Sequence, residues 1–232
     1  MKCIATVSDA KFIPRATAMI NSVKANSPGV DICIAMINPS EESTAQISSK
    51  GARPFLVFKE LNSKPINTRP GFVYSDLMAF CANYKIKFIH ELLNCEVSSI
   101  EQLIMMDADS IVRKDLGSLF DRLSDYDIIV KQREDMPDNH KIMAGVICVN
   151  NTAASRNFFA TASLAMQEIG MTKWFTDQHA LYEAFKYCKL KVGNLSDGYI
   201  DWLFNSESHI WVGKGNRKDN DQKYVQEEGK YS

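Results

Sequence analysis

The first sixty residues alternate between buried strands and helices, and this alternation restricts the fold more than any other feature of the chain. Apolar runs of strand length occupy residues 2–8, 31–37 and 53–59. Residues 12–26 and 41–50, between these runs, have the spacing of helices. Strands that alternate with helices form parallel sheets with right-handed crossovers. We therefore expect an α/β fold with a Rossmann-like, mostly parallel central sheet flanked by helices.

The same kinds of segment continue through the rest of the chain. Strands are predicted for residues 102–106, 127–131 and 142–149, and helices for 74–93, 152–166 and 176–188. A loop is predicted for residues 61–71, which contain two prolines and a glycine. We expect one domain over residues 1–218 and a polar tail over 219–232.

Composition excludes some classes of partner. The chain has 232 residues, 45% hydrophobic and 24% charged, with a formal net charge of −1. This balance gives no electrostatic reason to expect nucleic acid or an anionic membrane as a partner. No apolar run approaches the ~20 residues of a membrane span. The six cysteines form no Cys-x-x-Cys pair, and the N-terminus predicts a strand and no signal peptide, so we expect reduced thiols and a cytoplasmic protein.

Two carboxylates follow the apolar run at residues 102–106. On an extended backbone, Asp107 and Asp109 point the same way, beyond the carboxyl end of the strand. Open α/β sheets bind ligands at that edge. Two carboxylates this close repel unless a cation or proton lies between them, so a hard divalent ion that also binds phosphate oxygens is one interpretation. The other is that each Asp only forms a turn or caps a helix.

The run of residues 102–120 resembles a known family. Its apolar strand, its Asp107-Ala108-Asp109 and the following Ile-Val-Arg-Lys-Asp-Leu-Gly-Ser-Leu-Phe are similar to nucleotide-sugar glycosyltransferases of the GT-A fold. The closest similarity is to family 8, which includes glycogenin and bacterial galactosyltransferases, and it extends over residues 1 to about 218. The resemblance implies a UDP-sugar donor, Mn²⁺ or Mg²⁺ as cofactor, and sugar transfer with retention. The acceptor, whether a glycan, a lipid-linked sugar or a protein, is not identified.

The resemblance also assigns residues to the donor. It implies that residues at the end of the first strand hold the uracil and ribose, and that residues around the Asp pair and on a later helix and strand contact the rest of the donor. These residues are Ala5, Thr6, Ser8, Asp9, Lys85, Ala108, Ala144 and Gly145. The alternatives are purely structural roles: Asp9 caps a helix, Lys85 lies on a solvated helix face, and Gly145 leaves space for packing. Met143 stands where the family has an asparagine, so the sugar hydroxyls that are recognised stay undefined.

Two later stretches complete the implied site. Asp177-Gln178 resembles a helix start that contacts the donor sugar near its reacting carbon, although His179 replaces a family aspartate. His209 resembles the third metal ligand, beside Asp107 and Asp109, and Gly213 and Lys214 resemble residues that hold the diphosphate. Carboxylates with one imidazole favour Mn²⁺ over Mg²⁺. The spacing from His209 to Gly213 is one residue longer than in the family, and a structural histidine is the alternative.

The sequence therefore predicts a metal-dependent glycosyltransferase, and two alternatives stay open. A nucleotidyltransferase shares the sheet and the acidic metal ligands, but the segment of residues 8–14 lacks the glycines of a phosphate loop. A catalytically inactive module that binds a sugar nucleotide or a glycan is the third interpretation, because the surroundings of His209 and Met143 depart from the family pattern.

Overall fold

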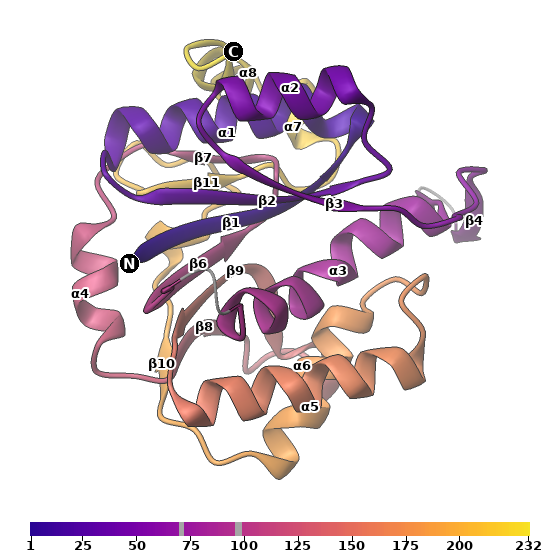
Figure 1. Ribbon diagram of the computed structural model, residues 1–232, viewed down its shortest axis with the longest axis vertical. Coiled ribbons are helices and arrows are strands. Elements are labelled where there is room, and N and C mark those ends of the chain that lie inside the picture. Colours follow the sequence, from indigo (N-terminus) through magenta and orange to yellow (C-terminus); the bar gives the residue numbers. More distant parts are fainter. Residues whose placement is uncertain (70–71, 96–98) are drawn as a thin grey trace.

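The computed structural model describes residues 1–69, 72–95 and 99–232. Its centre is a seven-stranded sheet with the order β10-β8-β9-β6-β1-β2-β3 (Figure 1). The strands are β1 (Lys2–Asp9), β2 (Asp31–Ile37), β3 (Arg53–Val57), β6 (Gln102–Met106), β8 (Ile128–Gln132), β9 (Ile142–Asn150) and β10 (Val192–Asn194). Of these seven, β9 alone runs antiparallel to its neighbours. The predicted α/β fold with a mostly parallel sheet is thus confirmed.

Helices cover both faces of the sheet (Figure 1). One face carries α1 (Ile13–Asn26) and α2 (Glu41–Ser49), and the other carries α3 (Asp76–Leu93), α5 (Ala153–Ile169) and α6 (Thr176–Tyr187). The short helix α4 (Gly117–Leu123) lies at the side. Three of these helices begin at a hydroxyl that accepts a backbone N–H of the first turn, which the caps Ser40, Ser75 and Thr152 provide. None of the helices in the described part of the chain has the length and hydropathy needed to span a bilayer.

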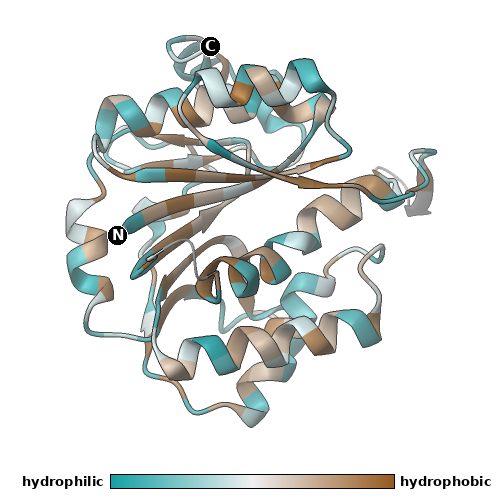
Figure 2. Cartoon of the chain, in the orientation of Figure 1, coloured by the Kyte–Doolittle hydropathy of each residue, from teal (hydrophilic) through white to brown (hydrophobic). Residues whose placement is uncertain are grey.

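The two layers of helices create two apolar cores, one on each side of the sheet. Along β1, Ala5 faces the α3 and α5 side whereas Ile4 faces α1. All five residues of β6 are buried, which explains why every residue of that strand after Gln102 is apolar (Figure 2). The carboxyl end of β6 is therefore the end of a central, fully buried strand of the sheet.

Two small sheets flank the central one. Strand β7 (Ser110–Val112), directly after the Asp pair, pairs antiparallel with β11 (Ile210–Val212). Strands β4 (Ile66–Arg69) and β5 (Phe72–Tyr74) form a hairpin that projects from the body (Figure 1). The sequence predicts a loop over 61–71, and the structure instead has β4 there, because the prolines on either side mask a short polar strand. Residues 70–71 of that predicted loop lie outside the described part.

The polar segment after residue 218 folds back onto the domain. It contains the end of α7 (Arg217–Asn220) and all of α8 (Gln222–Gly229). Tyr224 on α8 is fully buried against a cluster of Ile111, Phe204 and Trp211. The described residues also include three short 3₁₀ turns: η1 (Ala10–Phe12), η2 (Asp138–His140) and η3 (Asp197–Tyr199).

Candidate functional site

The carboxyl ends of β1 and β6 meet at one edge of the sheet, because the two strands are parallel neighbours. Asp107 and Asp109 follow β6 at that edge. The backbone N–H of Asp107 donates to the carbonyl of Gly145 on β9 at 3.1 Å, and the N–H of Gly213 donates to the carbonyl of Asp109 at 2.9 Å. Segments far apart in the sequence thus fix both aspartates.

Lys85 of α3 joins two carboxylates beneath this edge. Its Nζ lies 2.8 Å from Asp107 Oδ1 and 3.3 Å from Asp177 Oδ2, and it donates to the carbonyl of Ala144 at 2.8 Å. Lys85 is only 5% exposed, so it does not lie on a solvated helix face. Burial alone would lower the pKa of Lys85, but Asp107 and Asp177 outweigh that effect and raise it. A charged Lys85 therefore links α3, α6, β9 and the end of β6.

The N-terminus of α6 is held by a buried amide that the sequence analysis missed. Asn83 accepts the backbone N–H of Asp177 at 2.9 Å and donates to the carbonyls of Met171 and Lys173, both at 2.7 Å. Phe175, which precedes α6, has a left-handed backbone with φ of 66°, an uncommon state for an aromatic residue. Burial raises the pKa of the Asp177 carboxyl, and Lys85 opposes the shift. A polar Asn83 on the apolar face of a helix is the signal that could have identified it.

Asp109 has a different lysine partner. Lys218 Nζ lies 2.5 Å from Asp109 Oδ2, and the Tyr224 hydroxyl donates to the Asp109 carbonyl at 2.7 Å. Burial raises the pKa of Asp109 to about 6, a shift that Lys218 opposes and Asp107 increases. Lys218 was not assigned to the site from the sequence, because its partner Asp109 lies 109 residues earlier in the chain.

His209 lies apart from the two aspartates. Its ring stacks on Tyr199 with centroids 4.4 Å apart, and its backbone N–H donates to the carbonyl of Gly198 at 2.7 Å. Burial lowers the pKa of His209, and Lys114 contributes to that shift. A role for His209 at a metal stays a prediction, and it would require the ring to leave Tyr199.

Residues assigned to the donor on β1 are buried or already bonded. Ala5 and Thr6 have no exposed surface, and Ser8 is 1% exposed with its hydroxyl on the Asp9 carbonyl. Asp9 accepts the N–H of Phe12 at 3.0 Å and so caps η1. Asp9 therefore has the capping role that its position alone predicts, and it lies at the same edge as the Asp pair.

Close packing surrounds the Asp pair. Ala108 is 6% exposed and Ala144 is 3% exposed. A Cβ added at Gly145 would lie 3.3 Å from Asp107 Oδ2, and one at Gly213 would lie 3.0 Å from the Asp109 carbonyl oxygen. A side chain at either position would require its neighbours to shift, so both glycines shape the surroundings of the carboxylates.

The side chains at this edge fit a metal ion whose coordination shell a bound ligand completes. Within the described ranges, no three side chains of His, Cys, Asp or Glu form a group that could hold an ion. Hard cations such as Mg²⁺ often use one or two carboxylates together with substrate phosphates. Asp107 and Asp109 fit such an ion if phosphate oxygens complete its shell and Lys85 and Lys218 yield.

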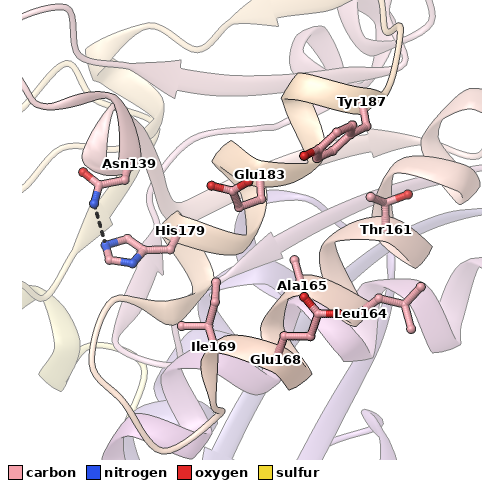
Figure 3. A pocket seen from close by; sticks show the side chains of 9 residues that line it. All are labelled: Asn139, Thr161, Leu164, Ala165, Glu168, Ile169, His179, Glu183 and Tyr187. Carbon is pink, nitrogen blue, oxygen red and sulfur yellow. Dashed lines mark hydrogen bonds between the residues drawn. The ribbon is translucent and has the colours of Figure 1, made fainter.

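A separate cavity of about 510 Å³ lies between α5 and α6 (Figure 3). Its lining residues are Asn139, Thr161, Leu164, Ala165, Glu168, Ile169, His179, Glu183 and Tyr187. His179 connects this cavity to the site, because it is on α6 two residues after Asp177 and hydrogen-bonds Asn139 at 3.2 Å (Figure 3). None of the residues assigned from the sequence lines the cavity.

Comparisons with known proteins identify the fold. No family model and no curated protein sequence matches the chain. The galactosyltransferase LgtC, solved with donor and acceptor sugar analogs, is similar with a TM-score of 0.67 and 15% identity over 99% of this chain and 96% of that one. The glycosyltransferase GlyE of Streptococcus pneumoniae gives 0.61 and 17% over 95% of this chain and 56% of its own. The bifunctional glycosyltransferase WbbM gives 0.61 and 14% over 99% of this chain and 50% of its own. The chain therefore has the GT-A fold, the fold of these glycosyltransferases.

Proposed function

We propose that this protein is a glycosyltransferase that moves a sugar from a UDP-sugar donor to an acceptor, with retention. The observation that carries the proposal is the buried Lys85, which holds Asp107 and Asp177 together at the carboxyl edge of a GT-A sheet. A buried charge cluster costs free energy unless every charge is paired, and groups with perturbed pKa values cluster at functional sites. The fold and the position of the cluster both support this edge of the sheet as the functional site.

The diphosphate would lie where the cations meet the Asp pair. Lys218 is already within hydrogen-bond distance of Asp109, whereas Lys214, which the resemblance assigns to the diphosphate, is directed to the Trp202 ring instead. The Lys218 ammonium group would stabilise the negative charge that develops on departing UDP. Asp9 and Ser8, at the end of the neighbouring strand, would lie beside the nucleoside.

A divalent ion, Mn²⁺ or Mg²⁺, would be held by Asp107 and Asp109. When bound, it would supply Lewis-acid stabilisation of the diphosphate. Lys85 and Lys218 partly offset the charge of the same carboxylates in the structure before any ligand arrives.

Asp177 and Gln178 would contact the donor sugar. The carboxamide oxygen of Gln178 is buried and has no hydrogen-bond partner within the described residues. A buried acceptor without a donor costs about 1–3 kcal/mol, which a sugar hydroxyl would recover. Lys85 and Asn83 fix the position of Asp177 and so orient this end of α6. Retention is supported by the resemblance to family 8.

Release of UDP tests the proposal. The protein is incubated with UDP-glucose, UDP-galactose and their N-acetyl forms, with and without Mn²⁺. We expect release from at least one donor, and a fall of about 100-fold in Asp177→Asn, because the amide cannot replace a positioned charge. Asp121→Asn is the matched control, since Asp121 is exposed and, among the described residues, forms an ion pair with Lys2 alone. No release from any donor would count against catalysis.

A catalytically inactive module is the second candidate. It is favoured by the full pairing of Asp107, Asp109 and Asp177 with lysines, which leaves none of these carboxylates free. In that case UDP-sugars would bind, and UDP release would stay at background in the wild-type protein and in Asp177→Asn alike.

A further inference from the structure

Two cations, Lys214 and Arg217, contact Trp202, and a third, Arg133, lies near Lys214. Lys214 Nζ lies 4.4 Å from the centroid of the Trp202 ring, and Arg217 donates to the Trp202 carbonyl at 2.9 Å. Arg133 enters from the loop after β8 and lies close enough to act electrostatically on Lys214. We call Arg133, Lys214 and Arg217 the cation cluster.

The cation cluster has no internal counter-charge. Within the described part of the chain, none of its three members forms a salt bridge, although Lys85, Lys131 and Lys218 all do. Arg133 donates one N–H to the carbonyl of His140 at 2.7 Å, while its buried Nε finds no partner. Partial burial lowers the pKa of Lys214, and repulsion from Arg133 and Arg217 adds to the effect. Like charges held together in this way are relieved by an anion.

The cation cluster lies next to the sheet edge that carries the Asp pair, but its members differ from the two lysines that contact those aspartates. Ile200 and Val212 both approach Gly145, which itself contacts Asp107. Trp202 and Lys214 follow these two residues by two positions, so both lie close to that edge. Asp107 and Asp109 are bonded by Lys85 and Lys218, whereas Lys214 is directed to the indole.

The cluster also borders the beginning of α6. His140, whose carbonyl accepts from Arg133, packs its ring on Phe175 with centroids 5.0 Å apart. Phe175 immediately precedes Thr176 and Asp177. Through Arg133 and His140, the cation cluster therefore reaches the residue that precedes α6.

We propose that the cation cluster binds an anionic group, a phosphate or a carboxylate, carried by the acceptor sugar. This inference rests on the proposed function. Guanidinium groups bind such planar or tetrahedral anions in bidentate fashion, and the Trp202 ring offers an apolar surface for the sugar itself. The cluster would thus select charged acceptors over neutral ones.

Direct binding tests the inference. With UDP present, titration calorimetry compares glucose and galactose with their 6-phosphates and their uronates. At low salt we expect at least one charged form to bind about tenfold tighter than its neutral sugar, or about 1.4 kcal/mol. Comparison of the affinities for the 6-phosphates and the uronates identifies which anion is preferred. Arg133→Gln and Arg217→Gln should each lose about tenfold for the charged form, and Arg133→Lys should keep part of it.

Controls separate this inference from the proposed function. Arg53→Gln removes an exposed guanidinium from the distant edge strand β3 and should change nothing. UDP affinity should change less than twofold in Arg133→Gln. Equal affinity for charged and neutral sugars, or an equal loss of UDP affinity in Arg133→Gln, would overturn the acceptor assignment while the donor site stands. Absence of UDP binding in the wild-type protein would instead overturn the proposed function.

Discussion

Removal of the Lys85 ammonium should destabilise the protein far more than an ordinary surface substitution. In Lys85→Met, the buried Asp177 loses its only cationic partner among the described residues, and the carbonyl of Ala144 loses a donor. Breaking a buried pair in this way costs about 3–5 kcal/mol, because one charge stays buried without compensation. For a chain of this size, we expect a fall in melting temperature of roughly 6–20 °C.

The helix itself offers a matched control for that experiment. Lys87 is on the same helix α3, and its exposed pair with Glu91, at 3.7 Å, is worth about 0.5 kcal/mol or less. Urea unfolding at pH 7 would compare Lys85→Met with Lys87→Met, and Lys85→Met/Asp177→Asn should recover part of the loss. If the two single variants differed by less than about 1 kcal/mol, the argument that Lys85 compensates buried carboxylates would be refuted.

Three further predictions concern the same edge and its border. Gly213→Ala places a Cβ 3.0 Å from the Asp109 carbonyl oxygen and should lower the free energy of unfolding in denaturant by about 1–3 kcal/mol. An unchanged free energy of unfolding would mean that the methyl group enters open space. Tyr224→Phe removes the buried donor to that carbonyl and should cost about 1–2 kcal/mol, so a melting temperature equal to wild type would contradict it. Burial, and next the charge of His179, lowers the pKa of His140, so the folded state binds fewer protons than the unfolded state. The stability that His140 contributes should therefore be complete above about pH 6.5 and fall as the pH is lowered. If the stability of His140→Gln depended on pH in the same way as that of the wild type, this prediction would be contradicted.

Periodicity and strand ends predicted most of the framework. The strand Gln102–Met106 has the predicted bounds, since a run buried on both faces has no polar interruption to blur them. Lys85 was assigned to the site by resemblance, and the structure places it on Asp107. These features depend on local pattern or on a short motif, which a single sequence preserves.

Long-range partners could not be predicted in the same way. Lys218, Tyr224 and Asn83 lie in unremarkable surroundings along the sequence, and only the folded chain brings them to Asp109 and Asp177. The segment around β11 is an example. Ile210 and Val212 face the core beside the Asp107 edge and Trp211 faces the opposite way, and His209, just before this strand, stacks on Tyr199, a contact that only the folded chain reveals.

Calorimetric titration of UDP tests the central claim most directly, because it asks whether the carboxyl edge binds a nucleoside diphosphate at all. We predict that UDP binds the wild-type protein in the presence of Mn²⁺, and that Asp109→Asn lowers this affinity at least about tenfold, since an amide lacks the charge to hold a hard cation beside a diphosphate. The exposed Asp121→Asn should bind as wild type does. Equal UDP affinity in Asp109→Asn and wild type would contradict the account.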